Sequence, residues 1–237
     1  MNVIVTSTAT DLFTENINDT FSSFTNYFVG LPKKIIANVD EYIATDKKRI
    51  KIEKIYAKYF DESDITFNDE PNFPNALKRV WTEALNCGAD YILHIESDWR
   101  LLDAVTIEDM LKEFPEHTQC AIRAYPRGIE KHPFVLSPSL IPASVVRACL
   151  EFLRPDHNPE CSIRETSRFV NTVFYPRNHE MCFVQDLGRN KLMDSKFRRN
   201  AYIEEQFVSY APLDKDTKRN LSGCDQSGFV DKQRSKK

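Results

Sequence analysis

Hydrophobic and polar positions follow two patterns along the first 120 residues. Continuous runs of apolar and β-branched residues are typical of buried strands, and they occupy residues 2–8, 34–40 and 90–95. Elsewhere apolar residues recur every three or four positions, which indicates amphipathic helices. These helical stretches are residues 11–28, 46–59, 72–86 and 106–114. Because strand and helix alternate, the pattern predicts an α/β fold with a mostly parallel sheet and helices on its faces.

The pattern becomes less regular after residue 120. Short strands are expected at residues 119–124, 134–137, 172–175 and 181–184, and a helix at residues 142–153. Asn158, Pro159 and Glu160 begin another helix, because Asn caps a first turn, Pro suits the first helical position and an acid suits the helix dipole. Residues 222–237 are predicted to be a flexible basic tail. We therefore expect a single domain over residues 1–221 with an irregular C-terminal part.

Composition argues against several classes of protein. The chain has 237 residues, of which 41% are hydrophobic and only 6 are glycine. Neither G-x-x-x-x-G-K-[ST] nor G-x-G-x-x-G occurs, so we expect neither a Walker-type NTPase nor a standard dinucleotide-binding oxidoreductase. No apolar run approaches the roughly 18 residues of a membrane helix, and no basic segment precedes the short apolar start. These features predict a cytoplasmic protein without membrane contact.

Charge divides unevenly between the two halves of the chain. Residues 1–120 carry 12 Lys and Arg against 21 Asp and Glu, a net charge of -9, and residues 121–237 carry 20 against 14, a net charge of +6. The positive half permits an anionic partner or substrate, although a solvated basic face explains it as well. The six cysteines form no C-x-x-C pair, so reduced core thiols are expected.

Acidic residues follow two of the predicted strands. Asp40 ends the second strand, and Glu96, Ser97 and Asp98 follow the strand at residues 90–95. In open α/β sheets ligands bind at the carboxyl ends of strands, and carboxylate oxygens suit Mg²⁺ or Mn²⁺. Asp98 is the expected direct ligand, with Glu96 nearer a ribose or a metal-bound water. Strand-end acids that simply face solvent are the alternative.

Two aromatic side chains near these acids have competing interpretations. His94 lies inside the apolar run, so a core histidine is favoured over a metal ligand. Trp99 follows Asp98, where it either packs beneath the acidic loop or stacks on a sugar.

The chain resembles the GT-A-fold, nucleotide-sugar-dependent glycosyltransferases, including phage-encoded DNA-modifying ones. The segments that carry the resemblance, spread over residues 1–200, are residues 3–8, Asp40, residues 90–99 and residues 183–189. The resemblance implies a GT-A (Rossmann-like) fold with a nucleotide-sugar half at residues 1–120 and an acceptor half at residues 121–221. It also implies that Asp40 contacts the nucleoside and that Glu96 and Asp98 bind the metal and diphosphate. Thr6 in the first strand is placed with the donor-binding residues.

The resemblance extends to residues late in the domain. A third metal ligand in the family, commonly a His, precedes an apolar residue and a Gly, and Asp186 stands in that place here. A carboxylate suits a hard cation at least as well, although Asp186 could also be a simple turn acid. Arg189, Arg198 and Arg199 could offset the diphosphate charge, or form a solvated basic face.

Inverting sugar transfer needs a general base for the acceptor hydroxyl. The resemblance implies an acid at a helix start in the acceptor half, which is Glu160, with Glu165 and Asp156 as further candidates. The alternative for Glu160 is an ordinary first-turn acid that favours the helix dipole.

These inferences predict a metal-dependent hexosyl- or pentosyltransferase that uses a UDP-sugar donor and Mn²⁺ or Mg²⁺. The positive second half and the phage-like resemblance make hydroxymethylcytosine in double-stranded DNA a candidate acceptor, with the host cytoplasm as the location. Polysaccharide, lipid-linked glycan and protein acceptors stay open. A nucleotidyltransferase is a second enzyme class, but residues 6–10 lack the glycines of its usual loop. A binding module that kept the fold without the chemistry is the non-enzymatic alternative.

Overall fold

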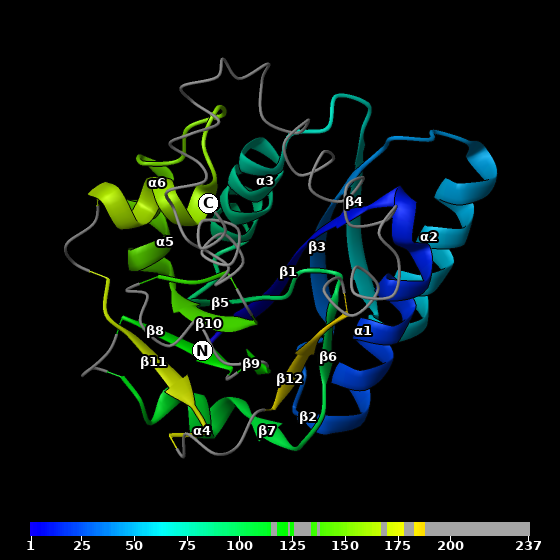
Figure 1. Ribbon diagram of the computed structural model, residues 1–237. Coiled ribbons are helices and arrows are strands. Elements are labelled where there is room, and N and C mark those ends of the chain that lie inside the picture. The colour runs from blue at the N-terminus through cyan, green and yellow to red at the C-terminus, as the bar shows by residue number, and fades with distance from the viewer. Residues whose placement is uncertain are drawn as a thin grey trace, which may run out of the picture.

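A seven-stranded sheet lies between two layers of helices (Figure 1). The computed structural model describes residues 1–114, 118–122, 124–125, 134–136, 138–166, 170–177 and 183–187. The strands of this sheet are β1 (Val3–Thr10), β3 (Lys34–Asp40), β4 (Glu62–Asn68), β5 (Tyr91–His94), β8 (Gln119–Ile122), β10 (Ser139–Pro142) and β11 (Thr172–Tyr175). The helices are α1 (Thr14–Tyr27), α2 (Asp46–Tyr59), α3 (Phe73–Asn86), α4 (Ile107–Leu111), α5 (Ala143–Leu150) and α6 (Pro159–Thr166), with a 3-10 turn, η1, at Asp11–Phe13.

The sheet is mostly parallel, which confirms the expected fold class. Its strand order is β11-β8-β10-β5-β1-β3-β4. Strand β1 pairs in parallel with β3 and β5, β3 with β4, and β8 with β11. Strand β10 is antiparallel to both β5 and β8, so it alone runs against the other strands of this sheet. The carboxyl ends of β1, β3, β4 and β5 therefore meet at one edge.

Two smaller sheets lie beside the central one. Strands β6 (Trp99–Leu101), β12 (Val184–Asp186) and β9 (Ala124–Tyr125) form one of them, and β2 (Phe28–Val29) pairs with β7 (Val105–Thr106) in the other. Strand β12 is antiparallel to β6 and parallel to β9. The β6-β12-β9 sheet thus joins the segment after β5 to the late part of the described chain.

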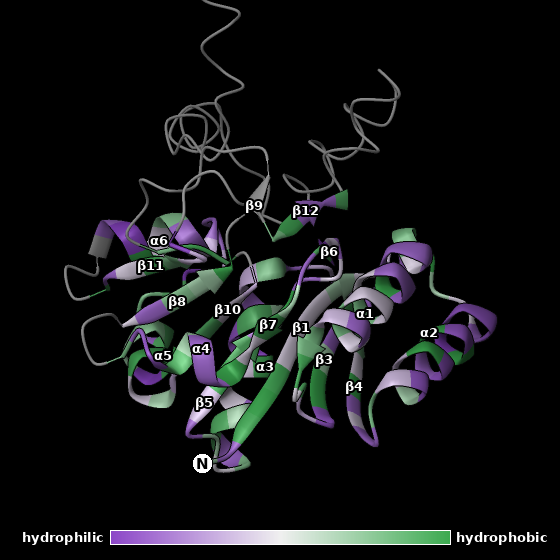
Figure 2. Cartoon of the chain, turned by 90° about the horizontal axis from the view of Figure 1, so that it is seen from below, coloured by the Kyte–Doolittle hydropathy of each residue, from purple (hydrophilic) through white to green (hydrophobic). Residues whose placement is uncertain are grey.

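Each face of the central sheet has its own hydrophobic core. On one face, α1 and α2 contribute Ile17, Phe21, Phe24, Ile52 and Tyr56, which pack with alternate residues of β1, β3 and β5. On the other face, α3, α5 and α6 contribute apolar side chains that include Trp81, Val146 and Ile163. The period-two alternation of strand side chains divides the residues between the faces. In Figure 2 the hydrophobic colour follows the central strands.

Local sequence signals account for the helix ends. The side chains of Thr45, Asn72 and Thr106 cap α2, α3 and α4 by accepting hydrogen bonds from backbone amides in the first turn. Beyond the end of α3, Gly88 has a φ of 76°, a left-handed conformation that glycine adopts without a steric penalty. The predicted helix at residues 46–59 and the strand at residues 34–40 have the observed bounds.

Two predicted strands differ from the structure, and several observed strands, among them β4 and β10 of the central sheet, were not predicted. Strand β4 was not predicted because most of its residues are polar. It is the outermost strand of the sheet, where side chains are exposed or half-buried and polar residues are tolerated. The strand expected at residues 134–137 is absent from the described residues 134–136, and β10 provides the sheet strand instead. Strand β12 begins at Val184, while residues 178–182 lie outside the described residues.

Hydrogen bonds with side chains, and not pairing with a neighbouring strand, fix the position of residues 134–136. The Gln119 amide donates to the carbonyl of Val135 over 2.6 Å, and Arg164 donates to the carbonyl of Phe134 over 2.7 Å. The backbone amide of Leu136 donates to Glu160 over 2.6 Å. Because these donors and acceptors are distant in sequence, periodicity could not reveal them.

The described part of the chain contains four cysteines. Cys120, Cys149 and Cys161 are buried free thiols, which agrees with the expected reduced core cysteines, and Cys87 is an exposed one. Within the described part of the chain, no helix has the length and apolar character needed to cross a membrane.

His94 is a core residue, as expected, and it should make stability pH-dependent. Its ring is fully buried, its Nδ1 shares a 3.0 Å hydrogen bond with the Thr6 hydroxyl, and it meets Trp81 edge to face. Burial lowers the pKa of His94 from 6.5 to about 3. Below pH 6.5 the unfolded chain binds a proton that the folded chain does not, so the free energy of unfolding should fall by up to about 1.4 kcal/mol per pH unit.

Urea unfolding between pH 7.5 and 4.5 tests this expectation against His94→Leu, which cannot titrate. The stability of the natural chain relative to the variant should decline as the pH falls below 6.5. Comparison with the variant cancels the opposite contribution of buried carboxyl groups such as Asp40, whose pKa is raised in the fold. A pH-independent difference between the two proteins would show that His94 is not held neutral.

Candidate active site

Polar residues gather where β1, β3, β4 and β5 end. The strand register places Thr10 beside Asp40 and Asp40 beside Asn68. The acidic tripeptide Glu96-Ser97-Asp98 follows β5, which pairs with the other side of β1. The strand-end acids predicted from the sequence therefore share one edge of the sheet.

Asp40 is the centre of a hydrogen-bond network. Its carboxylate accepts hydrogen bonds from Asn38 at 2.9 Å, from Asn68 at 3.3 Å and from the backbone amide of Asn72 at 3.1 Å. Burial raises the pKa of Asp40 to about 6, against the opposing effect of these hydrogen bonds. The network fixes the carboxylate at the β3 end, where the predicted nucleoside contact would occur.

A second buried acid at this edge was missed in the sequence. Asp11 follows β1 directly, and its carboxylate accepts hydrogen bonds from the amides of Tyr42 and Ile43 at 2.8 and 2.9 Å. Lys48 forms an ion pair with it at 3.5 Å. Asp11 thus anchors the loop after Asp40. The available signal was its place at a strand end, the same signal that identified Asp40.

The acidic tripeptide continues along β1 before the chain turns into β6. The amide of Ser97 donates to the carbonyl of Thr8 at 3.2 Å, and the Thr20 hydroxyl of α1 donates to the carbonyl of Ser97 at 2.9 Å. Trp99 is buried, and its indole nitrogen donates to the Glu96 carboxylate over 3.2 Å. Trp99 therefore packs beneath the acidic loop, which decides between its two interpretations.

Asp186 lies next to this loop although it is far away in sequence. In the antiparallel pairing of β12 with β6, Asp186 is the partner of Trp99. The amide of Leu187 donates to the carbonyl of Asp98 over 2.6 Å. The structure thus places Asp186 beside the acidic loop that contains Asp98.

Glu96, Asp98, Glu160 and Asp186 form what we call the acidic cluster. The pKa of Glu96 is raised well above its usual value, first by its removal from water and then by the negative charges of Asp98, Glu160 and Asp186, while the hydrogen bond from Trp99 opposes the rise. Four carboxyl groups, two from the loop after β5, one from α6 and one from β12, therefore interact electrostatically. A cation at this edge would relieve their mutual repulsion.

The acidic cluster suits a divalent cation that also binds substrate. Within the described part of the chain, no three His, Cys, Asp or Glu side chains are grouped so that they could hold a metal ion by themselves. Mg²⁺ is commonly bound by one or two carboxylates together with substrate phosphates, rather than by a cage of protein ligands alone. The hard oxygen donors of Asp98 and Asp186 fit Mg²⁺ or Mn²⁺ in this way.

Glu160 is held more firmly than an ordinary first-turn acid. It lies at the start of α6, where Asn158 caps the helix as predicted by accepting from the Glu160 amide at 2.9 Å. One carboxylate oxygen accepts from the amide of Leu136 at 2.6 Å, and the other from Arg164 at 3.0 Å. Its side chain is 15% exposed, whereas the further candidates, Glu165 and Asp156, are about half exposed.

Thr6 is the one remaining predicted residue that belongs to the described part of the chain. Thr6 lies inside β1, fully buried, with its hydroxyl bonded to His94, so the observed arrangement gives its side chain no contact with a ligand. This is a correction: strand interiors pack into the core, and only strand ends reach the edge. Arg189, Arg198 and Arg199 lie outside the described residues.

Comparison with known proteins establishes the kind of fold. No protein-family model and no curated protein matches the sequence. Among solved structures, S. aureus TarS 1-349 is similar with a TM-score of 0.54 at 13% identity, over 93% of this chain and 69% of that one. The same TarS segment in complex with UDP-GlcNAc gives a TM-score of 0.51 at 14% identity, over 78% of this chain and 58% of that one.

A cytidylyltransferase from Leptospira borgpetersenii serovar Hardjo-bovis is similar with a TM-score of 0.53 at 10% identity, over 90% of this chain and 99% of that one. This chain thus spans less than two thirds of the TarS chain in complex with UDP-GlcNAc and nearly all of the cytidylyltransferase. At such low identities the likeness concerns the fold. The sheet order, the shared edge of strand ends and these structural neighbours together show that the chain has a GT-A-like fold.

Proposed function

We propose that this protein is a metal-dependent glycosyltransferase that uses a UDP-sugar donor. The observation that carries the proposal is the acidic cluster at the carboxyl edge of a GT-A-like sheet, with Asp40 ending a strand of the same edge. A diphosphate and a divalent cation complement such a cluster, because the cation balances the charges of both. The UDP-GlcNAc complex of TarS, a protein with a similar fold, supports the choice of donor.

The acidic residues predicted from the sequence have separate roles in the proposed reaction. Asp40 would accept a hydrogen bond from the nucleoside, with acceptor capacity left beside its three existing hydrogen bonds. Asp98 and Asp186 would hold the cation, which supplies positive charge to the departing diphosphate. Glu96 is half-buried and accepts the hydrogen bond from Trp99, so it would hold the loop that carries Asp98 in position.

The proposed transfer is a single displacement with inversion. The acceptor hydroxyl oxygen forms a bond to the anomeric carbon of the sugar, while the bond from that carbon to the diphosphate oxygen breaks and its electron pair leaves with UDP. Glu160 would accept the hydroxyl proton as the general base. The hydrogen bonds from the Leu136 amide and from Arg164 orient the carboxylate for this role.

The identity of the acceptor is a separate part of the proposal. Hydroxymethylcytosine in duplex DNA was suggested by the positive charge of residues 121–237. The arginines invoked for anion binding, Arg189, Arg198 and Arg199, lie outside the described residues. Duplex DNA that contains hydroxymethylcytosine therefore belongs in an acceptor screen beside glycans and proteins.

Nucleotidyl transfer is the second candidate function. The similarity to a cytidylyltransferase over 99% of that chain favours it. The end of β1 weighs against it, because residues 6–10 contain no glycine, continue the strand and lead directly into the η1 turn at Asp11–Phe13. In this chain Asp11 uses its carboxylate to anchor the loop at Tyr42 and Ile43.

A substrate screen read by mass spectrometry tests the proposed function. The protein is incubated with UDP-sugars or with nucleoside triphosphates and sugar phosphates, in Mn²⁺, in Mg²⁺ or in a chelator, with acceptors that include the modified DNA. We expect UDP release from a UDP-sugar that depends on the cation. Pyrophosphate release from a triphosphate would instead establish nucleotidyl transfer, and UDP release that persists in the chelator would contradict the metal role.

A further inference from the structure

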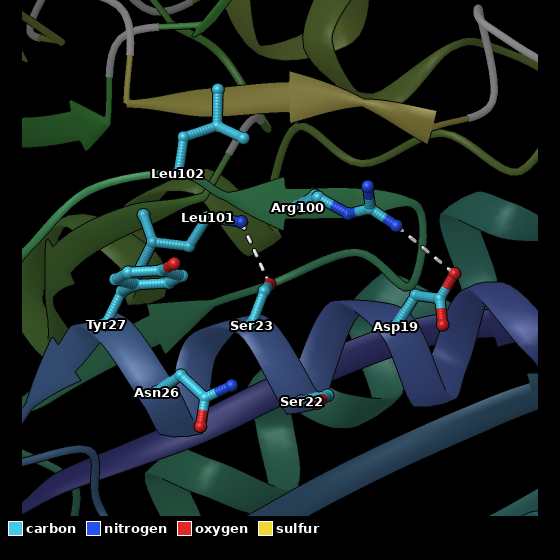
Figure 3. Close-up of a pocket in the computed structure, with 8 residues that line it drawn as sticks. All are labelled: Asp19, Ser22, Ser23, Asn26, Tyr27, Arg100, Leu101 and Leu102. Carbon is cyan, nitrogen blue, oxygen red and sulfur yellow. Dashed lines mark hydrogen bonds and ion pairs between the residues drawn. The ribbon is translucent and has the colours of Figure 1, made fainter.

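A surface pocket lies between α1 and β6, apart from the residues assigned to the acidic cluster. Its volume is about 260 Å³. Helix α1 supplies Asp19, Ser22, Ser23, Asn26 and Tyr27, and the chain from β6 onward supplies Arg100, Leu101 and Leu102 (Figure 3). None of these residues has a role in the proposed mechanism.

Hydrogen bonds shape the floor and one end of the pocket. The buried Ser23 hydroxyl accepts a hydrogen bond from the Leu101 amide at 2.9 Å and donates one to the carbonyl of Thr20 at 2.6 Å. Arg100 and Asp19 form an ion pair across the pocket at 3.4 Å, with both side chains more than 40% exposed. The floor is therefore fixed, and the polar groups at this end reach solvent.

The other end of the pocket is aromatic and apolar. Tyr27 is 44% exposed and Leu102 is 43% exposed, and Asn26 is exposed beside them on α1. A large exposed aromatic side chain combines a flat apolar face with a polar tip. A sugar ring matches such a surface, because its faces carry C–H groups and its edge carries hydroxyls.

The charge of the lining favours an uncharged ligand. Asp19 and Arg100 are the only charged residues among the eight, and they pair with each other, so the lining carries no net charge. Phosphate groups of a nucleic acid would require an excess of Lys or Arg. Serine, asparagine, aspartate and arginine together offer both donors and acceptors, which hydroxyl groups can use in either direction.

The pocket begins close to the proposed reaction site. Asp98 immediately precedes β6, and Arg100 and Leu102 lie two and four residues beyond it. At about 3.3 Å per extended residue, these positions are ~7 and ~13 Å along the chain from Asp98. The Thr20 hydroxyl also bonds the carbonyl of Ser97, so α1 is tied to the acidic loop itself.

We propose that this pocket is an acceptor subsite for a neutral glycan. The inference rests on the proposed glycosyltransferase function and names its acceptor class. The reacting hydroxyl would lie at the sheet edge by the acidic cluster, while neighbouring sugar units of the same chain lie along β6 with one ring against Tyr27. Binding of several units would orient the terminal hydroxyl toward the donor.

Titration calorimetry with neutral oligosaccharides tests the proposal on the full chain. The probes are tetramers of glucose in α-1,4 and β-1,4 linkage, of N-acetylglucosamine and of mannose. We expect at least one to bind, and we expect Tyr27→Ala and Asn26→Ala to weaken that binding by about tenfold. Asn75→Ala, on an exposed residue of α3 across the sheet, is the matched control and should bind as the natural chain does.

Hydrolysis of the UDP-sugar, measured on the same variants without acceptor, separates this proposal from the proposed function. The pocket variants should hydrolyse the donor at the natural rate, because Tyr27 and Asn26 belong to neither the donor site nor the proposed base. Binding of no tetramer, equal binding by all variants, or displacement of a tetramer by unmodified duplex DNA would overturn the neutral-glycan subsite while leaving donor hydrolysis intact. If the natural chain does not hydrolyse the UDP-sugar, the result would instead contradict the proposed glycosyltransferase function.

Discussion

Asp98→Asn is expected to abolish sugar transfer while the protein stays folded. The neutral amide would bind the cation weakly, so the diphosphate would leave without its counter-charge. Because such Lewis-acid stabilisation is worth several kcal/mol, turnover should fall by about a thousandfold or more. The fold should survive, since the hydrogen bond from Leu187 uses the backbone carbonyl of Asp98 and not its side chain.

Turnover at saturating Mn²⁺, together with circular dichroism and thermal unfolding, measures the effect of Asp98→Asn. Asp103→Asn serves as the matched control, because Asp103 is an exposed acid in the loop after β6 that lies outside the acidic cluster. The control should keep normal turnover. Near-normal activity of Asp98→Asn at saturating Mn²⁺ would remove Asp98 from the metal site.

Glu160→Gln should lower turnover by about a hundredfold or more while donor affinity stays nearly unchanged. An amide cannot accept the acceptor proton at neutral pH, so only the chemical step should suffer. The substitution also places an NH₂ group opposite the Leu136 amide or Arg164, both of which are hydrogen-bond donors. Some loss of stability is therefore expected as well.

Single-turnover rates, donor binding and unfolding curves separate these effects of Glu160→Gln. Glu165→Gln makes the same change on the same helix at an exposed residue whose carboxylate pairs with Arg154 at 2.8 Å. If Glu160 is the base, Glu165→Gln retains normal rates. Equal losses of donor binding and turnover in Glu160→Gln would give Glu160 a structural role, and normal activity would transfer the role of base to Glu165 or Asp156.

The glycan subsite and the two active-site substitutions test different parts of the molecule. Asp98 and Glu160 concern the chemical step at the sheet edge, whereas Tyr27 and Asn26 concern the acceptor along β6. The proposal expects the Asp98 and Glu160 variants to lose sugar transfer. It expects the Tyr27 and Asn26 variants to lose affinity for the acceptor.

Local sequence patterns were sufficient for much of the fold. The strand at residues 34–40 and the helix at residues 46–59 have the predicted bounds, because hydrophobic periodicity and capping residues act over a few neighbouring positions. The same locality explains why β4 was missed. An edge strand with exposed side chains needs no hydrophobic run, and its pairing with β3 is not visible in residues 62–68.

The residues of the candidate site were predictable in part. Asp40 and Asp98 could be selected because a strand end and an acid are adjacent in the sequence. Thr6 shows the limit of that reasoning, since its position within the strand, and not its residue type, buries it against His94. The pocket beside β6 carried no sequence signal, because its lining comes from a helix and a strand whose packing is a tertiary contact.

The sequence by itself determined the strand and helix alternation and the acids that end β3 and follow β5. Only the tertiary structure decided that Asp186 pairs beside Asp98 and that Glu160 joins the same acidic cluster. It also decided that Leu136 and Arg164 bond both oxygens of Glu160, and that β10 runs against its neighbours. The physical reason is that these arrangements depend on hydrogen bonds, strand pairing and electrostatic interactions between segments far apart in the chain, whereas periodicity and capping depend on neighbours.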